Sequence, residues 1–442
     1  MSQARWVLVF LGAWSLTGCG SSYEVGDPND TGPEVPADSG GYDLLDAATL
    51  PPGDDAGPSV DDADVPSVRV DAAIPNDEPD VPPDARPSDD PSAAGWIDPP
   101  VLGVDQDCCT ASPTVQLAND DEDQHDSGGL VVWTGRDYAA VWQGSNGPVL
   151  RHLDRSAQPI TARRELDATA VAAIGWGHHQ LAAVTSTPAM TPSAITFFDR
   201  DGDWLGTAQS APSPILASVT RHAAVHGWMS VGTLYEETAA AQYHRYLVSV
   251  VDGQPPAAML LGRAEGYGQG RAVVVSVASR LVSVEPSQTA TVVRAFANAA
   301  LTPSTPLTLD LGNDSSAARL RDTVMIIARP LGHAAETLVF DPFTNTMIGA
   351  PTTLDWTDDY FELAGDDIGG TVGVCFRDGD ALQFELLGPD GARIGRAINL
   401  ASVDMYASCA IASGAQDEFL VLWASASVVA GNIHATVVHV NR

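Results

Sequence analysis

The sequence predicts an all-β fold, and more closely a seven-bladed β-propeller, on three observations. From about Pro113 onward, short runs rich in Val, Leu, Ala, Phe and Tyr alternate with Gly, Asp, Asn and Pro, the pattern of strands separated by turns. One strand–turn–strand unit recurs at intervals mostly in the forties, the period of a propeller blade. No amphipathic helix of useful length interrupts the pattern.

The recurring unit is a hairpin whose turn centres on Asp or Gly in five of its six copies. The copies lie at Val149–Leu166, Ala194–Gln209, Tyr246–Leu261, Thr291–Leu309, Thr337–Leu354 and Leu382–Leu400. The turn positions are Asp154, Asp199, Asp252, Ala297, Asp341 and Gly388, separated by 45, 53, 45, 44 and 47 residues. Such regular spacing predicts copies of one structural unit rather than unrelated hairpins.

Another pair of short strands precedes each hairpin, which makes four strands per unit. In the first unit this pair is Leu130–Thr134 and Tyr138–Trp142. In later units the second strand of the pair falls at Gln180–Thr185, Met229–Leu234, Arg280–Val284, Val324–Ala328 and Thr371–Phe376. Four short antiparallel strands are the content of one propeller blade.

The seventh unit has only three predicted strands. They lie at Ser408–Ala412, Glu418–Trp423 and Ile433–Val440. A lone alternating segment, Pro113–Ala118, precedes the first complete unit and would supply the missing fourth strand, because a ring with an open edge invites aggregation. We therefore expect Thr114–Ala118 to lie outermost in the last blade. Its alternation places Val115 and Leu117 on one face and Gln116 on the other.

The competing architecture is a pair of β-sandwiches, which the regular period disfavours. Two named propeller repeats are not indicated either. WD dipeptides and kelch glycine pairs are missing at equivalent positions of the units. The fold prediction therefore depends on the strand period and not on a repeat motif.

Residues 20–107 differ in composition from the rest of the chain. They contain 22 acidic residues, two arginines and 15 of the 31 prolines, in a 442-residue chain with a formal charge of −35. Such a segment buries too little apolar surface to offset the entropy cost of folding, and its charges repel one another. We expect a disordered linker. A calcium-binding acidic tail is the disfavoured alternative, because the prolines prevent the carboxylates from clustering.

The first residues have the order of features found in an exported bacterial lipoprotein. Arg5 precedes an uncharged run from Trp6 to Leu16, which is too short to span a membrane as a mature helix. The run ends in Leu16-Thr17-Gly18-Cys19, which resembles a lipobox. The resemblance implies cleavage before Cys19, lipidation of its thiol and stable anchorage by several acyl chains. The alternative is an ordinary signal peptide followed by an incidental cysteine.

The resemblance extends to location and domain order. Gly20 is not the aspartate that marks inner-membrane retention, which implies an outer-membrane location facing the periplasm or the cell surface. The chain resembles lipoproteins with an Asp/Pro-rich stalk and a propeller-like domain from myxobacteria-like genomes. The implied domains are a signal peptide at 1–18, the lipidated cysteine with its linker at 19–107, and a propeller at 108–442. As a flexible coil, the linker would reach on the order of 50 Å.

Charge and missing residue types exclude several functions. The chain contains no lysine, which excludes a Schiff base and a phosphate-binding P-loop. A pI near 4.2 disfavours nucleic acid as a partner, because binding phosphates needs a basic face. No zinc-protease, nucleophile-elbow or Cys-x-x-Cys motif occurs, and we expect no cofactor.

Aromatic residues end the second strands of three units, at Trp142, Phe376 and Trp423. Because aromatic faces stack on pyranose rings, a sugar-binding platform is one interpretation. Recurrence at one position of the repeat favours the other interpretation, packing between neighbouring blades.

Several metal-binding patterns are present but incomplete. His222 and His226 have the spacing of two zinc ligands on a helix, yet they lie in strand-like sequence without an evident third ligand. The pair His178-His179 lies in a predicted turn. Asp199–Asp203 resembles part of a calcium loop but lacks the closing carboxylate, and its position indicates a hairpin turn. In the dense cluster Asp120–Asp126, a solvated loop is favoured over a divalent-ion site.

Four cysteines remain after Cys19 is lipidated, and an exported chain with an even number is expected to contain disulfides. Cys375 is predicted in the second strand of the sixth unit and Cys409 in the first strand of the seventh. Neighbouring blades would bring these two within bridging distance, which favours that pair. The alternative joins Cys108 or Cys109 to Cys409.

Two classes of function follow. The first is a non-enzymatic, monomeric lipoprotein, anchored to the membrane through Cys19, whose propeller is a rigid binding or scaffold module; a protein or a glycan on the propeller face is the ligand considered. The second is a carbohydrate-active enzyme with acid and base groups at the central channel, since residues from different blades leave no local motif. Polar side chains converging at the channel mouth would favour a ligand site, and an apolar plug would favour a scaffold.

Overall fold

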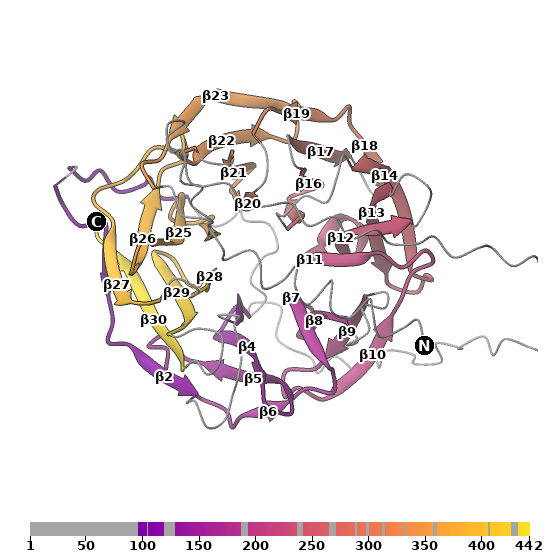
Figure 1. Ribbon diagram of the computed structural model, residues 1–442, viewed down its shortest axis with the longest axis horizontal. Coiled ribbons are helices and arrows are strands. Elements are labelled where there is room, and N and C mark those ends of the chain that lie inside the picture. The colour runs from indigo at the N-terminus through magenta and orange to yellow at the C-terminus, as the bar shows by residue number, and fades with distance from the viewer. Residues whose placement is uncertain are drawn as a thin grey trace, which may run out of the picture. The chain divides into compact units, whose positions relative to one another are not determined.

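The computed structural model describes residues 96–442, apart from 104, 119–128, 187–192, 237–241, 265–270, 288–289, 298–299, 312–313, 331–332, 357–359, 405–406 and 426–431. These residues form seven antiparallel sheets around a central axis, which confirms the seven-bladed β-propeller (Figure 1). Among these residues the sole helical element is the 3-10 turn η4 (Ala223–Val225). The described residues contain no helix that could cross a membrane. The predicted signal peptide, Cys19, most of the predicted linker and Asp120–Asp126 lie outside the described residues.

Each complete blade is a four-stranded meander with its first strand nearest the axis and its last at the perimeter (Figure 1). Blade 1 contains β3 (Leu130–Trp133), β4 (Tyr138–Gly144), β5 (Gly147–Leu153) and β6 (Arg164–Glu165). Blade 2 contains β7 (Ala170–Gly177), β8 (Gln180–Ser186), β9 (Ala194–Phe198) and β10 (Trp204–Ala208). Blade 3 contains β11 (Ile215–His222), β12 (Gly227–Glu236), β13 (Gln242–Val251) and β14 (Ala257–Ala264).

The next three blades repeat this order. Blade 4 contains β15 (Val273–Val277), β16 (Arg280–Pro286), β17 (Thr291–Ala297) and an outer strand split into β18 (Thr302–Pro303) and β19 (Leu307–Leu309). Blade 5 contains β20 (Asp314–Leu320), β21 (Thr323–Arg329), β22 (Glu336–Asp341) and β23 (Thr346–Thr353). Blade 6 contains β24 (Phe361–Asp366), β25 (Thr371–Asp378), β26 (Ala381–Leu387) and β27 (Ile398–Ser402). The six hairpins predicted from the sequence are the third and fourth strands of blades 1 to 6.

Blade 7 joins segments from both ends of the described chain. Its three inner strands are β28 (Cys409–Ser413), β29 (Glu418–Ala424) and β30 (Ile433–Val440). Two N-terminal strands, β1 (Cys109–Ala111) and β2 (Val115–Ala118), pair one after the other with the outer edge of β30. The predicted closing strand is therefore confirmed, and β1, which the sequence pattern did not indicate, extends it.

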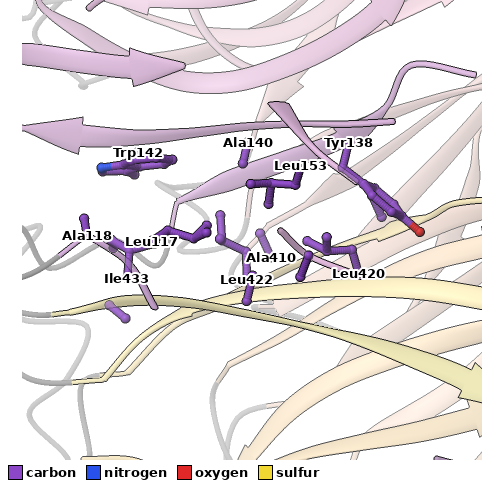
Figure 2. Packing of buried hydrophobic residues seen from close by; sticks show 14 of the residues in the cluster. Leu117, Ala118, Tyr138, Ala140, Trp142, Leu153, Ala410, Leu420, Leu422 and Ile433 are labelled. Carbon is purple, nitrogen blue, oxygen red and sulfur yellow. The ribbon is translucent and has the colours of Figure 1, made fainter. Parts of the chain in front are cut away.

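The register of β2 decides which of its side chains are buried. The ladder to β30 skips Leu117, which makes Leu117 the extra residue of a β-bulge. Leu117 packs into the core between blades 1 and 7 (Figure 2). Val115 packs against the same core, whereas Gln116 is exposed, as predicted. The bulge also buries Ala118, which strict alternation does not predict.

Apolar side chains pack between neighbouring blades. Trp142 belongs to the cluster between blades 1 and 7 (Figure 2), and Trp423 belongs to the cluster between blades 6 and 7. Phe376 stacks on Trp356 with ring centroids 4.9 Å apart. The three rings that ended predicted second strands are at most 3% exposed, so interblade packing is confirmed and their faces are closed to a sugar.

The up-and-down meander gives the ring two faces. The turn face carries the connections from first to second and from third to fourth strands, including the hairpin turns at Asp154, Asp199, Asp252 and Asp341. The loop face carries the connections from second to third strands and from blade to blade, such as 144–147, 209–214 and 379–380. Every first strand therefore begins at the loop face, beside the channel.

Candidate ligand site at the channel mouth

Four polar residues from three consecutive blades lie at or near the loop-face ends of their first strands. Arg271 directly precedes the first strand of blade 4, and Ser316 lies in β20 of blade 5. Tyr360 precedes β24 of blade 6, and Glu362 lies within it. Because all three first strands begin at the loop face, these residues occupy similar levels of the channel. We call Arg271, Ser316, Tyr360 and Glu362 the mouth cluster.

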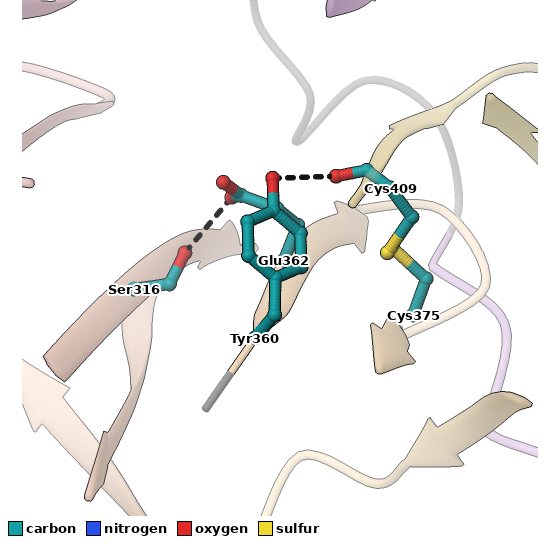
Figure 3. The surroundings of a disulfide bond; sticks show 5 residues. All are labelled: Ser316, Tyr360, Glu362, Cys375 and Cys409. Atoms are coloured by element: carbon teal, nitrogen blue, oxygen red, sulfur yellow. Dashed lines mark hydrogen bonds between the residues drawn. A yellow bond between two sulfur atoms is a disulfide. The ribbon is translucent and has the colours of Figure 1, made fainter. Parts of the chain in front are cut away.

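Hydrogen bonds of the mouth cluster cross two blade boundaries (Figure 3). Ser316 donates its hydroxyl to Glu362 Oε2 at 3.4 Å, between blades 5 and 6. Tyr360 donates its phenolic hydroxyl to the carbonyl oxygen of Cys409 at 3.0 Å, between blades 6 and 7. Ser316 is buried, while Tyr360 and Glu362 are each partly exposed, so part of the cluster is accessible to solvent.

The surroundings of the mouth carboxyl group disfavour its charged form on balance. Burial raises the pKa of Glu362, although the charge of Arg271 and the hydrogen bond from Ser316 act in the opposite direction. Burial also raises the pKa of Tyr360; the negative charge of Glu362 adds to this effect and Arg271 opposes it. Since Arg271 belongs to blade 4 and Glu362 to blade 6, their interaction passes the inner edge of blade 5.

A disulfide lies next to the mouth cluster and links blades 6 and 7. It joins Cys375 in β25 to Cys409 in β28, with Cα atoms 6.5 Å apart, and is the pair that the sequence favoured (Figure 3). Glu362 lies directly opposite Cys375 in the ladder between β24 and β25. Cys409 also supplies the carbonyl that accepts from Tyr360. The crosslink thus holds blades 6 and 7 together at the level of the candidate site.

The remaining cysteines of the described chain are the buried free thiols Cys108 and Cys109. Cys109 lies opposite Val440, at one end of β30. Cys409 lies opposite Trp423, which in turn lies opposite His434 near the other end of β30. Six residues of strand span about 20 Å, so the alternative disulfide to Cys409 is excluded in this structure.

The histidines singled out in the sequence do not form a metal site. His222 is buried at the end of β11, where its Nδ1 lies 2.9 Å from Ser276 Oγ. His226 ends the turn η4 in a left-handed conformation with φ 49°. His178 and His179 form the predicted turn between β7 and β8. In the described ranges, no three His, Cys, Asp or Glu side chains are placed to share a metal ion.

Asp199–Asp203 is a hairpin turn, as its position indicated. Asp199 Oδ1 accepts hydrogen bonds from the backbone nitrogens of Asp201 and Asp203, at 2.9 and 2.8 Å. Asp154 and Asp341 bind backbone nitrogens in the corresponding turns of blades 1 and 5. These aspartates shape their turns, which explains why Asp recurs at this position of the repeat.

A buried Asp–His pair on the turn face was not indicated by the sequence. His152 Nδ1 lies 2.9 Å from Asp137 Oδ1, and His152 Nε2 lies 2.9 Å from the carbonyl oxygen of Arg200. Arg200 also forms an ion pair with Asp137. Burial acts to raise the pKa of Asp137, but hydrogen bonds from Thr134 and His152 and the charge of Arg200 lower it overall. Both ring nitrogens are engaged, so the pair joins blades 1 and 2 rather than serving as an open base.

The chain that leads into the propeller lies on the turn face. The guanidinium of Arg321 lies over the ring of Trp96, 5.1 Å from its centroid, and donates a hydrogen bond to the carbonyl oxygen of Ile97. Ile97 donates its backbone N–H to the carbonyl oxygen of Ile368 at 3.1 Å. Residues 96 and 97, which composition assigned to the linker, are therefore held on the face opposite the mouth cluster.

No residue of the mouth cluster was singled out from the sequence. Arg271, Ser316 and Glu362 are separated by 45 and 46 residues, so nothing local connects them. One signal was available, because these distances equal one repeat and place all three near the starts of successive first strands. Polar residues at that repeated position indicate a polar channel mouth.

No protein-family model matches the chain, and no curated protein matches it. Among solved structures, the WD40 domain of Toxoplasma gondii coronin has a TM-score of 0.51 at 11% identity, covering 78% of this chain and 89% of that one. The β-propeller domain of Myceliophteria thermophila Cps50 (Swd1) has a TM-score of 0.48 at 11% identity, covering 73% of this chain and 98% of that one. At such identities the coronin likeness supports the fold alone. The chain is a seven-bladed β-propeller protein with a polar channel mouth.

Proposed function

We propose that this protein is a membrane-anchored recognition module that binds a protein partner on the loop face of its propeller. The observation that carries this proposal is the convergence of Glu362, Tyr360, Ser316 and Arg271 at the channel mouth. A few polar groups gathered in a partly buried setting are typical of a binding site, whereas a scaffold needs only an apolar plug there. The segment at Trp96 and Ile97 occupies the turn face and leaves the loop face for a ligand.

A protein is favoured over a glycan and over an enzymatic substrate. The rings considered as a sugar-stacking platform, Trp142, Phe376 and Trp423, are buried. A glycosidase acting by acid–base catalysis needs two carboxyl groups across the scissile bond. The mouth cluster contributes one, Glu362, and the nearby Asp314 is paired with Arg329 at 3.6 Å.

The binding proposal is tested by affinity capture from a detergent extract of cell envelopes with the full-length protein. We expect a retained protein that is lost with Glu362→Ala and kept with the matched turn-face variant Asp154→Ala. A glycan array and a glycan-hydrolysis assay run alongside. Retention that does not depend on Glu362, or specific glycan binding or turnover in place of protein capture, would overturn the proposal.

The anchor is tested separately at Cys19. Its support is the lipobox resemblance together with the acidic, proline-rich stretch that follows it. We expect wild-type protein to incorporate a fatty-acid label and to partition with membranes, and Cys19→Ser to do neither. Unchanged fractionation of Cys19→Ser would show that the anchor was misread, without affecting the binding test.

A further inference from the structure

Building on the proposed function, we propose that the mouth cluster accepts one cationic side chain, an arginine presented by the partner, which pairs with Glu362. Three observations lead to this class of ligand: the unused capacity of the carboxylate, the charge of the loop face, and the rigid mounting of Glu362. Each is independent of the others.

The Glu362 carboxylate has room for further donors. Among the described residues, its oxygens accept one hydrogen bond, from the hydroxyl of Ser316 to Oε2 at 3.4 Å. An ionised carboxylate offers about four acceptor positions and binds a guanidinium through two parallel hydrogen bonds. Arg271 approaches from blade 4 and affects Glu362 through its charge. An arginine arriving along the channel would supply the donors that Ser316 alone does not.

The loop face around the mouth attracts cations. Its described connections carry five aspartates, Asp167, Asp310, Asp355, Asp380 and Asp404. One of them, Asp355, is ion-paired with Arg393 at 2.7 Å. These described connections contain a single arginine, Arg271. This imbalance repels an anionic ligand and steers a cationic segment toward the face. The burial that raises the pKa of Glu362 has the same consequence, because a partner cation would stabilise the charged carboxylate.

The backbone around Glu362 is fixed by the neighbouring strand and by a hydrogen bond, so we expect the residue to keep its position when a ligand binds. Its cross-strand neighbour Cys375 is crosslinked to Cys409 of the next blade. Its sequence neighbour Tyr360 is hydrogen-bonded to the same residue. A group held on both sides pays little ordering entropy on binding, as a recognition carboxylate requires.

The test uses the full chain and a labelled tetrapeptide, Gly-Ser-Arg-Gly, with Gly-Ser-citrulline-Gly as a neutral isostere. Fluorescence anisotropy is measured at physiological salt, where the Debye length of about 8 Å limits binding to distant charges. We expect saturable binding of the arginine peptide and at least about tenfold weaker binding of the citrulline peptide, a difference of about 1.4 kcal/mol. Glu362→Gln should cause a similar loss, whereas the control Asp201→Asn, at an exposed position of the opposite face, should change affinity less than twofold.

A further variant is expected to raise the affinity for the arginine peptide instead of lowering it. Arg271→Gln removes the cation that competes for Glu362 and should strengthen binding of the arginine peptide, which a purely structural cluster would not do. Equal affinity for the two peptides, an equal loss in Asp201→Asn, or no saturable binding at millimolar peptide would overturn the inference. If partner capture still depends on Glu362 in that case, the proposed function stands and the cationic ligand is wrong. If capture is independent of Glu362, the proposed function itself fails.

Discussion

Glu362 lies directly opposite Cys375 in the ladder between β24 and β25, and Cys375 is crosslinked to Cys409 of the next blade. The carboxyl group of this site thus adjoins a covalent link between two blades. Such an arrangement couples the stability of the interface between blades 6 and 7 to the geometry of the channel mouth. Variants of the two cysteines test the stability of the propeller, and variants of Glu362 test binding.

Removing the crosslink should destabilise the propeller. The bond closes a loop with a sequence separation of 34, for which chain entropy predicts about 3–4 kcal/mol. We expect the double variant Cys375→Ser/Cys409→Ser to lower the free energy of unfolding by this amount in urea titrations. Reducing agent should then change wild-type stability and leave the double variant unaffected. Non-reducing peptide mapping that recovered Cys109 joined to Cys409 would contradict the structure.

Glu362 should make stability depend on pH. Burial raises its pKa in the folded state above the unfolded value of about 4.3, so its favourable contribution is complete below that value and is lost as pH rises through the folded pKa. Glu362→Gln should therefore match wild type in acid and be at least as stable at neutral pH. The measurement is urea unfolding of both proteins from pH 4 to pH 8. A variant clearly less stable than wild type at pH 7 would show that the carboxylate serves the fold.

Asp137 should show the opposite pH dependence. Burial opposes its ionisation, but its hydrogen bonds and the charge of Arg200 leave its pKa lowered, so its contribution is present above about 3.9 and is lost as pH falls through the folded pKa. Asp137→Asn should cost about 2–3 kcal/mol near neutral pH, because His152 and Arg200 lose a charged partner. The deficit should shrink in acid. The exposed Asp201→Asn in the adjacent hairpin turn serves as the control and should change the unfolding midpoint little.

Closure of the ring should depend on one side chain of β2. Leu117 is buried between blades 1 and 7, and Leu117→Ala should lower stability by about 2–5 kcal/mol. The exposed neighbour Gln116 provides the matched control, and Gln116→Ala should change the melting temperature little. Equal melting temperatures for these two variants would show that another segment closes the ring.

Two truncations test the same closure on a larger scale. Deleting residues 20–118 removes β1 and β2 and leaves the outer edge of β30 unpaired, so the melting temperature should fall steeply. Deleting residues 20–95 leaves every described strand in place and should leave the melting temperature unchanged. Equal melting for the two truncations would contradict the closure seen here.

Much of the fold could be predicted because its information is local. Strand alternation and turn residues can be recognised within a few positions, and their repetition at one period predicted the blades. The missing strand of the seventh unit then predicted the closing strand at Thr114–Ala118. The Asp turns were legible for the same reason, since Asp199 and Asp154 bind backbone only a few residues away. Local pattern did not indicate β1 or the bulge at Leu117, because both depend on the edge that β30 offers.

By itself, the sequence determined the class of fold, the number of blades and the strand that closes them, together with the features that resemble a lipobox. The tertiary structure alone decided that Ser316 and Glu362 are hydrogen-bonded across two blades, and that Cys109 lies too far along β30 to reach Cys409. The physical reason is geometric. A ring of blades brings positions one repeat apart to the same level of a shared channel, while the distance between two cysteines depends on which ends of which strands they occupy.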